Sequence, residues 1–237
     1  TTDGEYAHLT GTIPKDGVWS FKRSADNYMP LTLNQQLLKL GYNSYAYHGH
    51  TYTYYSRDKH LTNLGYNYKG LGGGLEVKKT WPESDVEVVD LATADFVGQQ
   101  PFSVYYMTIS GHRELNFGGN YIAAKNKALV ADLPYSTPVR AYIATQLELE
   151  MSMKLLLERL EADGKLQDTV FVCYTDHYLY GLQDQELLQQ KSEEAGSAIL
   201  EKTPAFIWWP GCEGIQIDKV CHTVALAPTV MNLFGME

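Results

Sequence analysis

Asp176 and His177 form the clearest candidate for a chemical site in the sequence, because they directly follow an apolar segment. Residues 169–175 (Thr-Val-Phe-Val-Cys-Tyr-Thr) are apolar on both faces and predict a central parallel strand that ends at this pair. Beyond a strand end, neighbouring side chains need not alternate, so a carboxylate and an imidazole can turn toward one cation such as Zn²⁺ or Mn²⁺. A catalytic metal needs at least one further oxygen donor, and a nucleophilic hydroxyl would suit. The competing interpretation of Asp176-His177 is a solvated pair in a loop.

Histidines follow two further predicted strands. His48-Gly49-His50 comes after the strand expected at residues 42–47, and Ser110-Gly111-His112 comes after the apolar run at residues 102–109. The carboxyl ends of strands form the usual ligand edge of an open α/β sheet, so these imidazoles are expected near Asp176. The alternative is that His48 and His112 only complete the hydrogen bonding of a turn.

The segments that would hold these residues alternate between helix and strand patterns. Ser84-x-x-Glu87 resembles a capping box, and Thr137-Pro138 is a typical helix start. Helices are expected at residues 30–40, 84–98, 137–163 and 226–234, and strands at residues 42–47, 102–109, 169–175 and 205–209, the last of them buried. This alternation predicts an α/β fold with a mainly parallel sheet covered on both faces. Residues 1–17 are expected to form a loop.

Composition and charge are those of one sizeable soluble domain. The chain has 237 residues, of which 44% are hydrophobic and 20% charged, and its formal net charge is -9. Partners that are nucleic acids or anionic surfaces require clustered Lys and Arg, which this sequence lacks, so both classes are disfavoured. No run of about 18 apolar residues occurs, and no signal-peptide pattern is present, so no membrane span is expected within these residues.

The three cysteines leave the redox compartment open. Cys173 lies in an apolar run and is expected to be a core thiol. Cys212 and Cys221 could flank a hairpin, and their spacing leaves open whether they form a disulfide.

Five short motifs, taken together and in order, resemble one known family. The motifs are Thr1-Thr2-Asp3-Gly4-Glu5-Tyr6, Tyr47-His48-Gly49-His50, Tyr55-Ser56-Arg57, Ser110-Gly111-His112 and Tyr174-Thr175-Asp176-His177-Tyr178. They resemble the lipoteichoic acid synthase type of phosphoglycerol transferase, which belongs to the sulfatase and alkaline phosphatase superfamily. The resemblance covers residues 1 to about 180, and Ala227-Pro228-Thr229 resembles the family's closing helix. Singly, none of these motifs is specific.

The resemblance implies a site built on one divalent metal ion, Mn²⁺ or Mg²⁺, with Zn²⁺ also suited. Thr1 would bind the metal and act as the nucleophile, and Asp176 and His177 would be the other metal ligands present in this chain. A metal lowers the pKa of a bound hydroxyl, which makes it reactive. The family's remaining ligand, a glutamate on an early strand, would lie upstream of Thr1. This chain alone is therefore expected to bind metal poorly and to be inactive.

The resemblance also implies a grip on the phosphoryl group. His48, Arg57 and His112 would hold its oxygens, because a guanidinium and imidazoles stabilise the charge of the transition state. His112 would also be the acid for the leaving alcohol. The alternative for Arg57 is a simple ion pair with Asp58 or Glu76.

Two positions depart from the family's pattern. Tyr55 stands where the family usually has a tryptophan before the substrate arginine, so its contact with a glycerol headgroup is expected to differ. His50 has no clear family counterpart and is expected at the surface.

The fold implied by the resemblance is an alkaline phosphatase-like (sulfatase) three-layer sandwich with a mainly parallel central sheet. Residues 1–237 would form a single catalytic domain fragment that lacks the upstream strand and membrane segments. The parent enzyme would be anchored in the bacterial membrane and face the outside of the cell. It would take the headgroup of a lipid such as phosphatidylglycerol and pass it to a glycerol or glycan acceptor.

Three other functions compete with this one. The same scaffold can hydrolyse sulfate esters or phosphate esters. A hydrolase with Thr1 as an N-terminal nucleophile would need strands at once, and it would give Asp176 and His177 no role. A non-catalytic anion-binding module is the third. Residues 70–74 (Gly-Leu-Gly-Gly-Gly) lack the Lys-Ser/Thr of a phosphate-binding loop, and a flexible turn is expected there.

Overall fold

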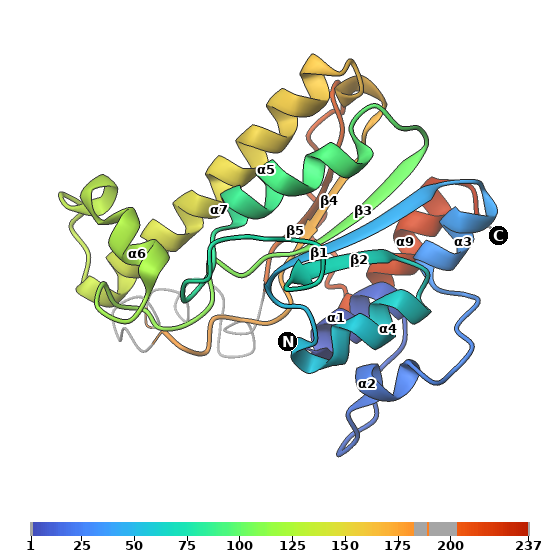
Figure 1. Ribbon diagram of the computed structural model, residues 1–237, viewed down its shortest axis with the longest axis horizontal. Coiled ribbons are helices and arrows are strands. Elements are labelled where there is room, and N and C mark those ends of the chain that lie inside the picture. The colour runs from blue at the N-terminus through green and yellow to red at the C-terminus, as the bar shows by residue number, and fades with distance from the viewer. Residues whose placement is uncertain (1, 183–188, 190–202, 237) are drawn as a thin grey trace.

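The computed structural model describes residues 2–182, 189 and 203–236, whose strands form two sheets (Figure 1). In the larger sheet, β1 (Asn43–Thr51) is central and pairs in parallel with β2 (Asn67–Leu71) and β3 (Phe102–Met107). In the smaller sheet, β4 (Phe171–Tyr174) pairs antiparallel with β5 (Ala205–Trp208). The predicted α/β fold with a mainly parallel sheet is confirmed.

Helices lie on both faces of the larger sheet, which gives the fold three layers (Figure 1). The helices are α1 (Thr2–Thr10), α2 (Ser20–Ser24), α3 (Leu33–Lys39), α4 (Arg57–Asn63), α5 (Asp85–Phe96), α6 (Tyr121–Lys125), α7 (Thr137–Ala162) and α9 (Leu226–Leu233). α5 and α7 pack against each other on one side, and α1, α4 and α9 lie on the other. Of the four predicted helices, α5, α7 and α9 match closely, and α3 is shorter than expected.

The loop expected at residues 1–17 is wrong over its first half, because α1 occupies Thr2–Thr10. This helix buries Glu5 and His8 together with Ala7 and Leu9. Since polar and apolar side chains both face inward, the apolar period that marks a helix is absent from the sequence.

Two strands run through residues that were predicted as turns. β1 does not end before His48 but continues to Thr51, and Gly70 and Leu71, expected in a flexible turn, end β2. Gly49 is buried in β1, where a Cβ would lie about 3.0 Å from Val88 of α5. The close approach of α5 therefore requires the small residue that resembled a turn signal.

The main core lies between the larger sheet and the helices α5 and α7. Phe96 is 1% exposed and packs against the rings of Tyr45, Tyr47 and Phe102. Leu160 of α7 belongs to the same cluster. Burial of these rings stabilises the contact between α5 and β1, on which the site residues of both elements depend.

Replacing Phe96 by alanine is expected to lower the free energy of unfolding by about 3 to 5 kcal/mol, because it leaves a cavity among rings that cannot close around it. Chemical denaturation followed by circular dichroism measures this. Leu91→Ala is the control on the same helix, since Leu91 is 44% exposed and should change stability little. A loss below about 1 kcal/mol for Phe96→Ala would show that this core is not packed as described.

The structure confirms that β4 and β5 are strands, but their neighbours and their burial differ from the prediction. β4 was expected to be a central parallel strand, but among the described residues its strand partner is the antiparallel β5. β5 was expected to be buried, but Phe206 is 55% exposed and Trp208 37%. An apolar run predicts a strand whose side chains are buried by neighbouring elements. The described residues do not fully bury the side chains of these two strands.

A large cavity separates the two sheets. Its volume is about 1530 Å³, and all residues of two segments line it: residues 102–109, which contain β3, and residues 168–175, which contain β4. Each of the two strands has, in the described ranges, a strand partner on one edge only. The segments that follow the two strands, which contain His112 and Asp176, both line the same cavity.

The three thiols are free. Cys173 is half-buried, as its place in β4 requires, so the expectation of a core thiol holds only in part. The disulfide left open between Cys212 and Cys221 is not formed.

Candidate active site

Asp176 and His177 follow β4 and point their ligand atoms toward each other. His177 Nε2 lies 3.5 Å from Asp176 Oδ2, and His177 Nδ1 donates a hydrogen bond to the main-chain oxygen of Tyr178 at 2.8 Å. The hydrogen bond at Nδ1 fixes the tautomer that leaves the Nε2 lone pair for a metal. Two ligand atoms bonded to one cation at about 2.0 to 2.2 Å lie roughly 3.0 to 3.5 Å apart, so this pair fits a shared divalent ion.

The pair needs further ligands. In residues 2–182, 189 and 203–236, no group of three or more His, Cys, Asp or Glu side chains is placed to hold a metal. Thr1, predicted as nucleophile and metal ligand, lies outside the described residues. Asp176 and His177 are thus the two predicted ligands that the structure brings together.

The first turn of α1 lies directly against the Asp176 backbone. A Cβ on Gly4 would overlap the carbonyl oxygen of Asp176, so only glycine permits this approach. One turn later, the His8 ring stacks on Tyr174 of β4 with centroids 4.0 Å apart. The start of α1 and the end of β4 therefore meet next to Asp176 and His177, the two candidate metal ligands.

Arg57 opens α4 and is held by Glu5 of α1. Its Nε donates to Glu5 Oε1 at 3.0 Å and its Nη2 to Oε2 at 2.6 Å, and both side chains are buried. The predicted alternative partners, Asp58 and Glu76, are wrong. Burial opposes the charge of Arg57, but the adjacent carboxylate outweighs it and raises the pKa of the guanidinium. Arg57 Nη1 is buried and has no hydrogen-bond partner among the described residues.

His48 lies inside β1 with one nitrogen bonded and one free. Its Nδ1 donates to the main-chain oxygen of Met107 on β3 at 2.8 Å, since a carbonyl can only accept. Nε2 is buried and has no partner in the described part of the chain. Burial and the nearby charge of Arg57 hold the pKa of His48 well below its ordinary value. The His48 imidazole is therefore neutral beside the Arg57 cation. An anion that enters the cavity would favour protonation of this imidazole.

His112 lies in the turn after β3. Its main-chain N–H donates to the oxygen of Ile109 at 2.8 Å, and Asn120 Nδ2 donates to the oxygen of His112 at 3.0 Å. The half-buried ring contacts Trp81 edge to face at 5.3 Å. Burial, and then the charge of Arg113, lower the pKa of His112.

His50 was expected at the surface, but it is largely buried in the structure. Its Nδ1 lies 2.9 Å from Oε1 of the fully buried Glu83, and its ring touches Tyr54 and Trp81. Trp81 in turn contacts His112, so one indole joins the imidazoles of β1 and of the β3 turn.

Tyr55 packs its ring against the Arg57 guanidinium. Its ring centroid lies 5.4 Å from Arg57 Cζ, and its backbone has φ 54° in the left-handed region. The ring also meets Trp19 at 5.5 Å. The Tyr55 ring therefore lies beside the Arg57 guanidinium in the cavity.

The structure brings the predicted site residues other than Thr1 to one cavity. The predicted site residues among those that line it are His48, Tyr55, Arg57, His112, Asp176 and His177. Sequence reasoning missed Glu5, Trp81 and Asp85, which line the same cavity. Glu5 stood in a quoted motif without a role, and an acidic residue four positions after a candidate nucleophile was the available signal. Trp81 and Asp85 gave no signal beyond the capping box.

Comparisons with known proteins show what this chain is similar to. A family model described as Sulfatase matches residues 1–236. The chain is 24% identical to lipoteichoic acid synthase of Staphylococcus saprophyticus and 24% to lipoteichoic acid synthase 2 of Bacillus subtilis, over all of this chain and 37% of each relative. The chain thus spans little more than a third of these relatives. The crystal structure of the lipoteichoic acid synthase LtaP from Listeria monocytogenes matches with a TM-score of 0.83 at 23% identity, over all of this chain and 60% of that one.

Proposed function

Because the chain belongs to the sulfatase family of enzymes, we propose that it is the catalytic part of a metal-dependent phosphoglycerol transferase. Its substrate is the headgroup of a lipid such as phosphatidylglycerol, and its acceptor is a glycerol or a glycan. The similarity to lipoteichoic acid synthases along the whole chain supports this class of reaction. The parent protein is anchored in the bacterial membrane and works on its outer side. No helix in the described part of the chain is long and apolar enough to cross a membrane.

Two buried nitrogens without partners are the observation that supports the proposal most. Arg57 Nη1 and His48 Nε2 both lie buried at the cavity and are unsatisfied by the described residues. An unpaired buried polar group costs about 1 to 3 kcal/mol, so a ligand that satisfies both is strongly favoured. A tetrahedral phosphoryl group has oxygens for both, and Arg57 is already oriented for it by Glu5.

The metal ligands fit the same place. Asp176 and His177 would hold the cation, and Thr1, three residues before Gly4 in the sequence, would be the nucleophile and third ligand; Gly4 contacts Asp176. When bound, the cation lowers the pKa of the hydroxyl and neutralises charge on a phosphoryl oxygen. Asp176 and His177 are close enough to share one ion, and their donor types suit Mn²⁺, Mg²⁺ or Zn²⁺ to different degrees.

The transfer takes place in two half-reactions, and each site residue has a role in them. The Thr1 oxygen, after losing its proton to solvent, forms a bond to phosphorus while the bond from phosphorus to the lipid alcohol breaks. His112, after taking a proton from solvent, gives that proton to the alcohol, and His48 and Arg57 hold the phosphoryl oxygens. In the second half, the acceptor hydroxyl attacks phosphorus and gives its proton to His112, while the bond from phosphorus to the Thr1 oxygen breaks and that oxygen takes a proton back from solvent.

The cavity between β3 and β4 has, among the described residues, an open strand edge on both sides. Both strands border it, and each has a described partner on one edge only. An extended segment from outside these 237 residues would satisfy both edges and cover their apolar side chains. We propose that this segment is the upstream strand, with the remaining carboxylate ligand at its carboxyl end beside Asp176.

Metal binding tests the incomplete site. Mn²⁺ is expected to bind this chain alone at least about 10-fold more weakly than a longer chain with the upstream strand, and Asp176→Asn in the longer chain is expected to abolish binding. Isothermal titration calorimetry measures both. Asp132→Asn is the matched control, since Asp132 is exposed and does not line the cavity. Turnover by the 237-residue chain alone would contradict the proposal of a missing ligand.

Hydrolysis of a sulfate or phosphate ester is the second candidate, because the same two nitrogens suit any tetrahedral oxyanion. The longer chain should be given phosphatidylglycerol with a glycerol acceptor, and separately a generic sulfate ester. The proposal expects transfer of glycerol phosphate to the acceptor and negligible sulfate release. The reverse result would establish a sulfatase.

A further inference from the structure

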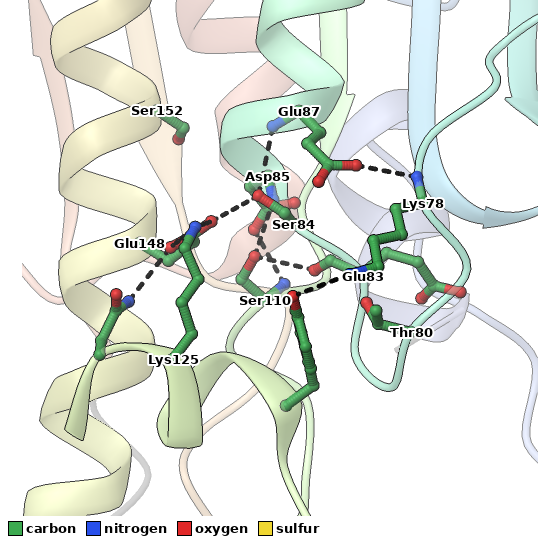
Figure 2. A network of polar contacts seen from close by, with 12 residues as sticks. Lys78, Thr80, Glu83, Ser84, Asp85, Glu87, Ser110, Lys125, Glu148 and Ser152 are labelled. Atoms are coloured by element: carbon green, nitrogen blue, oxygen red, sulfur yellow. Dashed lines mark hydrogen bonds and ion pairs between the residues drawn. The ribbon is translucent and has the colours of Figure 1, made fainter.

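Three consecutive buried residues, Glu83, Ser84 and Asp85, tie together three elements around the site (Figure 2). Glu83 Oε1 bonds to the His50 ring of β1 at 2.9 Å. Ser84 Oγ donates to Glu148 of α7. Asp85 bonds instead to the turn after β3. Residues 83–85 therefore form a joint, which fixes the positions of β1, α7 and the β3 turn relative to one another.

Asp85 contacts the β3 turn through both carboxylate oxygens. Oδ1 accepts the N–H of Ile109 at 2.9 Å, and Oδ2 accepts the N–H of Ser110 at 2.9 Å. The Ser110 hydroxyl returns the contact: it donates to the main-chain oxygen of Glu83 at 3.0 Å and accepts the N–H of Asp85 at 2.8 Å. Four hydrogen bonds in a buried place thus fix two successive residues of the turn.

The same two residues determine where His112 lies. The N–H of His112 donates to the oxygen of Ile109, the residue whose own N–H is bonded to Asp85. Only Gly111 separates Ser110 from His112. A shift of the Ile109-Ser110 backbone would therefore move the imidazole relative to the phosphoryl site.

Glu148 supports this joint from the other side. Its two oxygens accept from Lys125 Nζ at 2.8 and 2.9 Å, and Asn126 Nδ2 donates to Oε2 at 3.1 Å (Figure 2). Burial raises the pKa of Asp85 to about 6, against the effect of its hydrogen bonds, and Glu148 adds to the rise. At neutral pH the Asp85 carboxylate is thus ionised, and both of its oxygens can accept.

We infer that Asp85 is a positioning residue for His112, whose carboxylate holds the Ile109-Ser110 turn and so sets the imidazole against the phosphoryl group. The role given to His112 rests on the proposed function, whereas the contacts of Asp85 do not. Asp85 does not itself touch the reacting atoms. Its removal should therefore impair turnover much more than substrate binding.

Asp85→Asn in the longer, active chain is the test. An asparagine offers one acceptor oxygen and places N–H groups against the N–H donors of the turn. The kcat is expected to fall about 10- to 100-fold, since a misplacement of about 1 Å can cost 100-fold, with KM within about twofold of the wild type. Hydrogen exchange of Ile109 and Ser110 amides should accelerate.

Asp95→Asn is the matched control, with the same substitution at the other end of α5. Its carboxylate accepts from Tyr47 and Lys69 and has no bond to the turn. Both variants are compared at equal folded fraction by circular dichroism. Equal kcat values for Asp85→Asn and Asp95→Asn would overturn the inference and leave the proposed function intact.

The NMR signals of the histidine rings distinguish the two ideas if the wild type shows no phosphoglycerol transfer. That result would contradict the proposed function. The positioning of His112 by Asp85 would then be measured directly. Asp85→Asn should shift the His112 ring signal while leaving that of His8 unchanged, because His8 is bonded within α1. An unshifted His112 signal would overturn the positioning role.

Discussion

Replacing Thr1 by alanine is expected to abolish phosphoglycerol transfer in the longer chain, with kcat lowered about 10⁴-fold or more. Removal of a nucleophile leaves only the contribution of binding and of the charged grip, because no other group forms the bond to phosphorus. Radiolabelled phosphatidylglycerol with a glycerol acceptor measures the loss. The fold should remain, since the substitution removes only a hydroxyl and a methyl group.

Thr2→Ala is the matched control for Thr1→Ala. Thr2 carries the same hydroxyl one residue later and begins α1. It should retain most of the wild-type kcat. If Thr1→Ala kept its activity while Thr2→Ala lost it, the nucleophile would be assigned to the wrong threonine.

Replacing Glu5 by alanine is expected to destabilise the protein by about 3 to 5 kcal/mol, the second large effect. Glu5 is the bidentate partner of Arg57, and both side chains are buried, so the variant leaves a buried guanidinium without its counter-charge. Urea denaturation measures the change. The same variant should lose transfer activity, because Arg57 is no longer oriented toward the phosphoryl group.

Two further variants separate the pair from a general effect of charge. Glu76→Ala, at the exposed residue that sequence alone offered as a partner of Arg57, should leave stability within about 0.5 kcal/mol of the wild type. Glu5→Ala combined with Arg57→Met should regain much of the lost stability, because no unpaired charge remains buried. A double variant as unstable as Glu5→Ala would show that the cost is not electrostatic.

Elements with an ordinary pattern were predictable from the sequence. The apolar runs of β3 and β4, the capping box of α5 and the Thr137-Pro138 start of α7 each indicate their element by local physics. α1 was not predictable, because its buried face includes Glu5 and His8 as well as apolar side chains. The antiparallel pairing of β4 with β5 and the exposure of β5 were not predicted, because apolar runs do not specify which strand will lie alongside.

The candidate site was predictable only in outline. The expectation that His48, His112 and the Asp176-His177 pair lie at one cavity is met, although β1 continues past His48 and β4 lies outside the parallel sheet. The partner of Arg57 could not be inferred, because Glu5 is 52 residues away in the sequence and the contact depends on how α1 and α4 pack. The same limit applies to Asp85, whose contacts with the β3 turn exist only in the folded chain.

Detection of the covalent intermediate tests the central claim most directly. The longer chain is incubated with Mn²⁺ and phosphatidylglycerol without an acceptor, quenched, digested and mapped by mass spectrometry. The expected result is a glycerophosphoryl group on Thr1, which disappears when acceptor is added and does not form in Asp176→Asn. Transfer activity with the group on another residue, or with no group on the protein, would contradict a threonine nucleophile held beside Asp176 and His177.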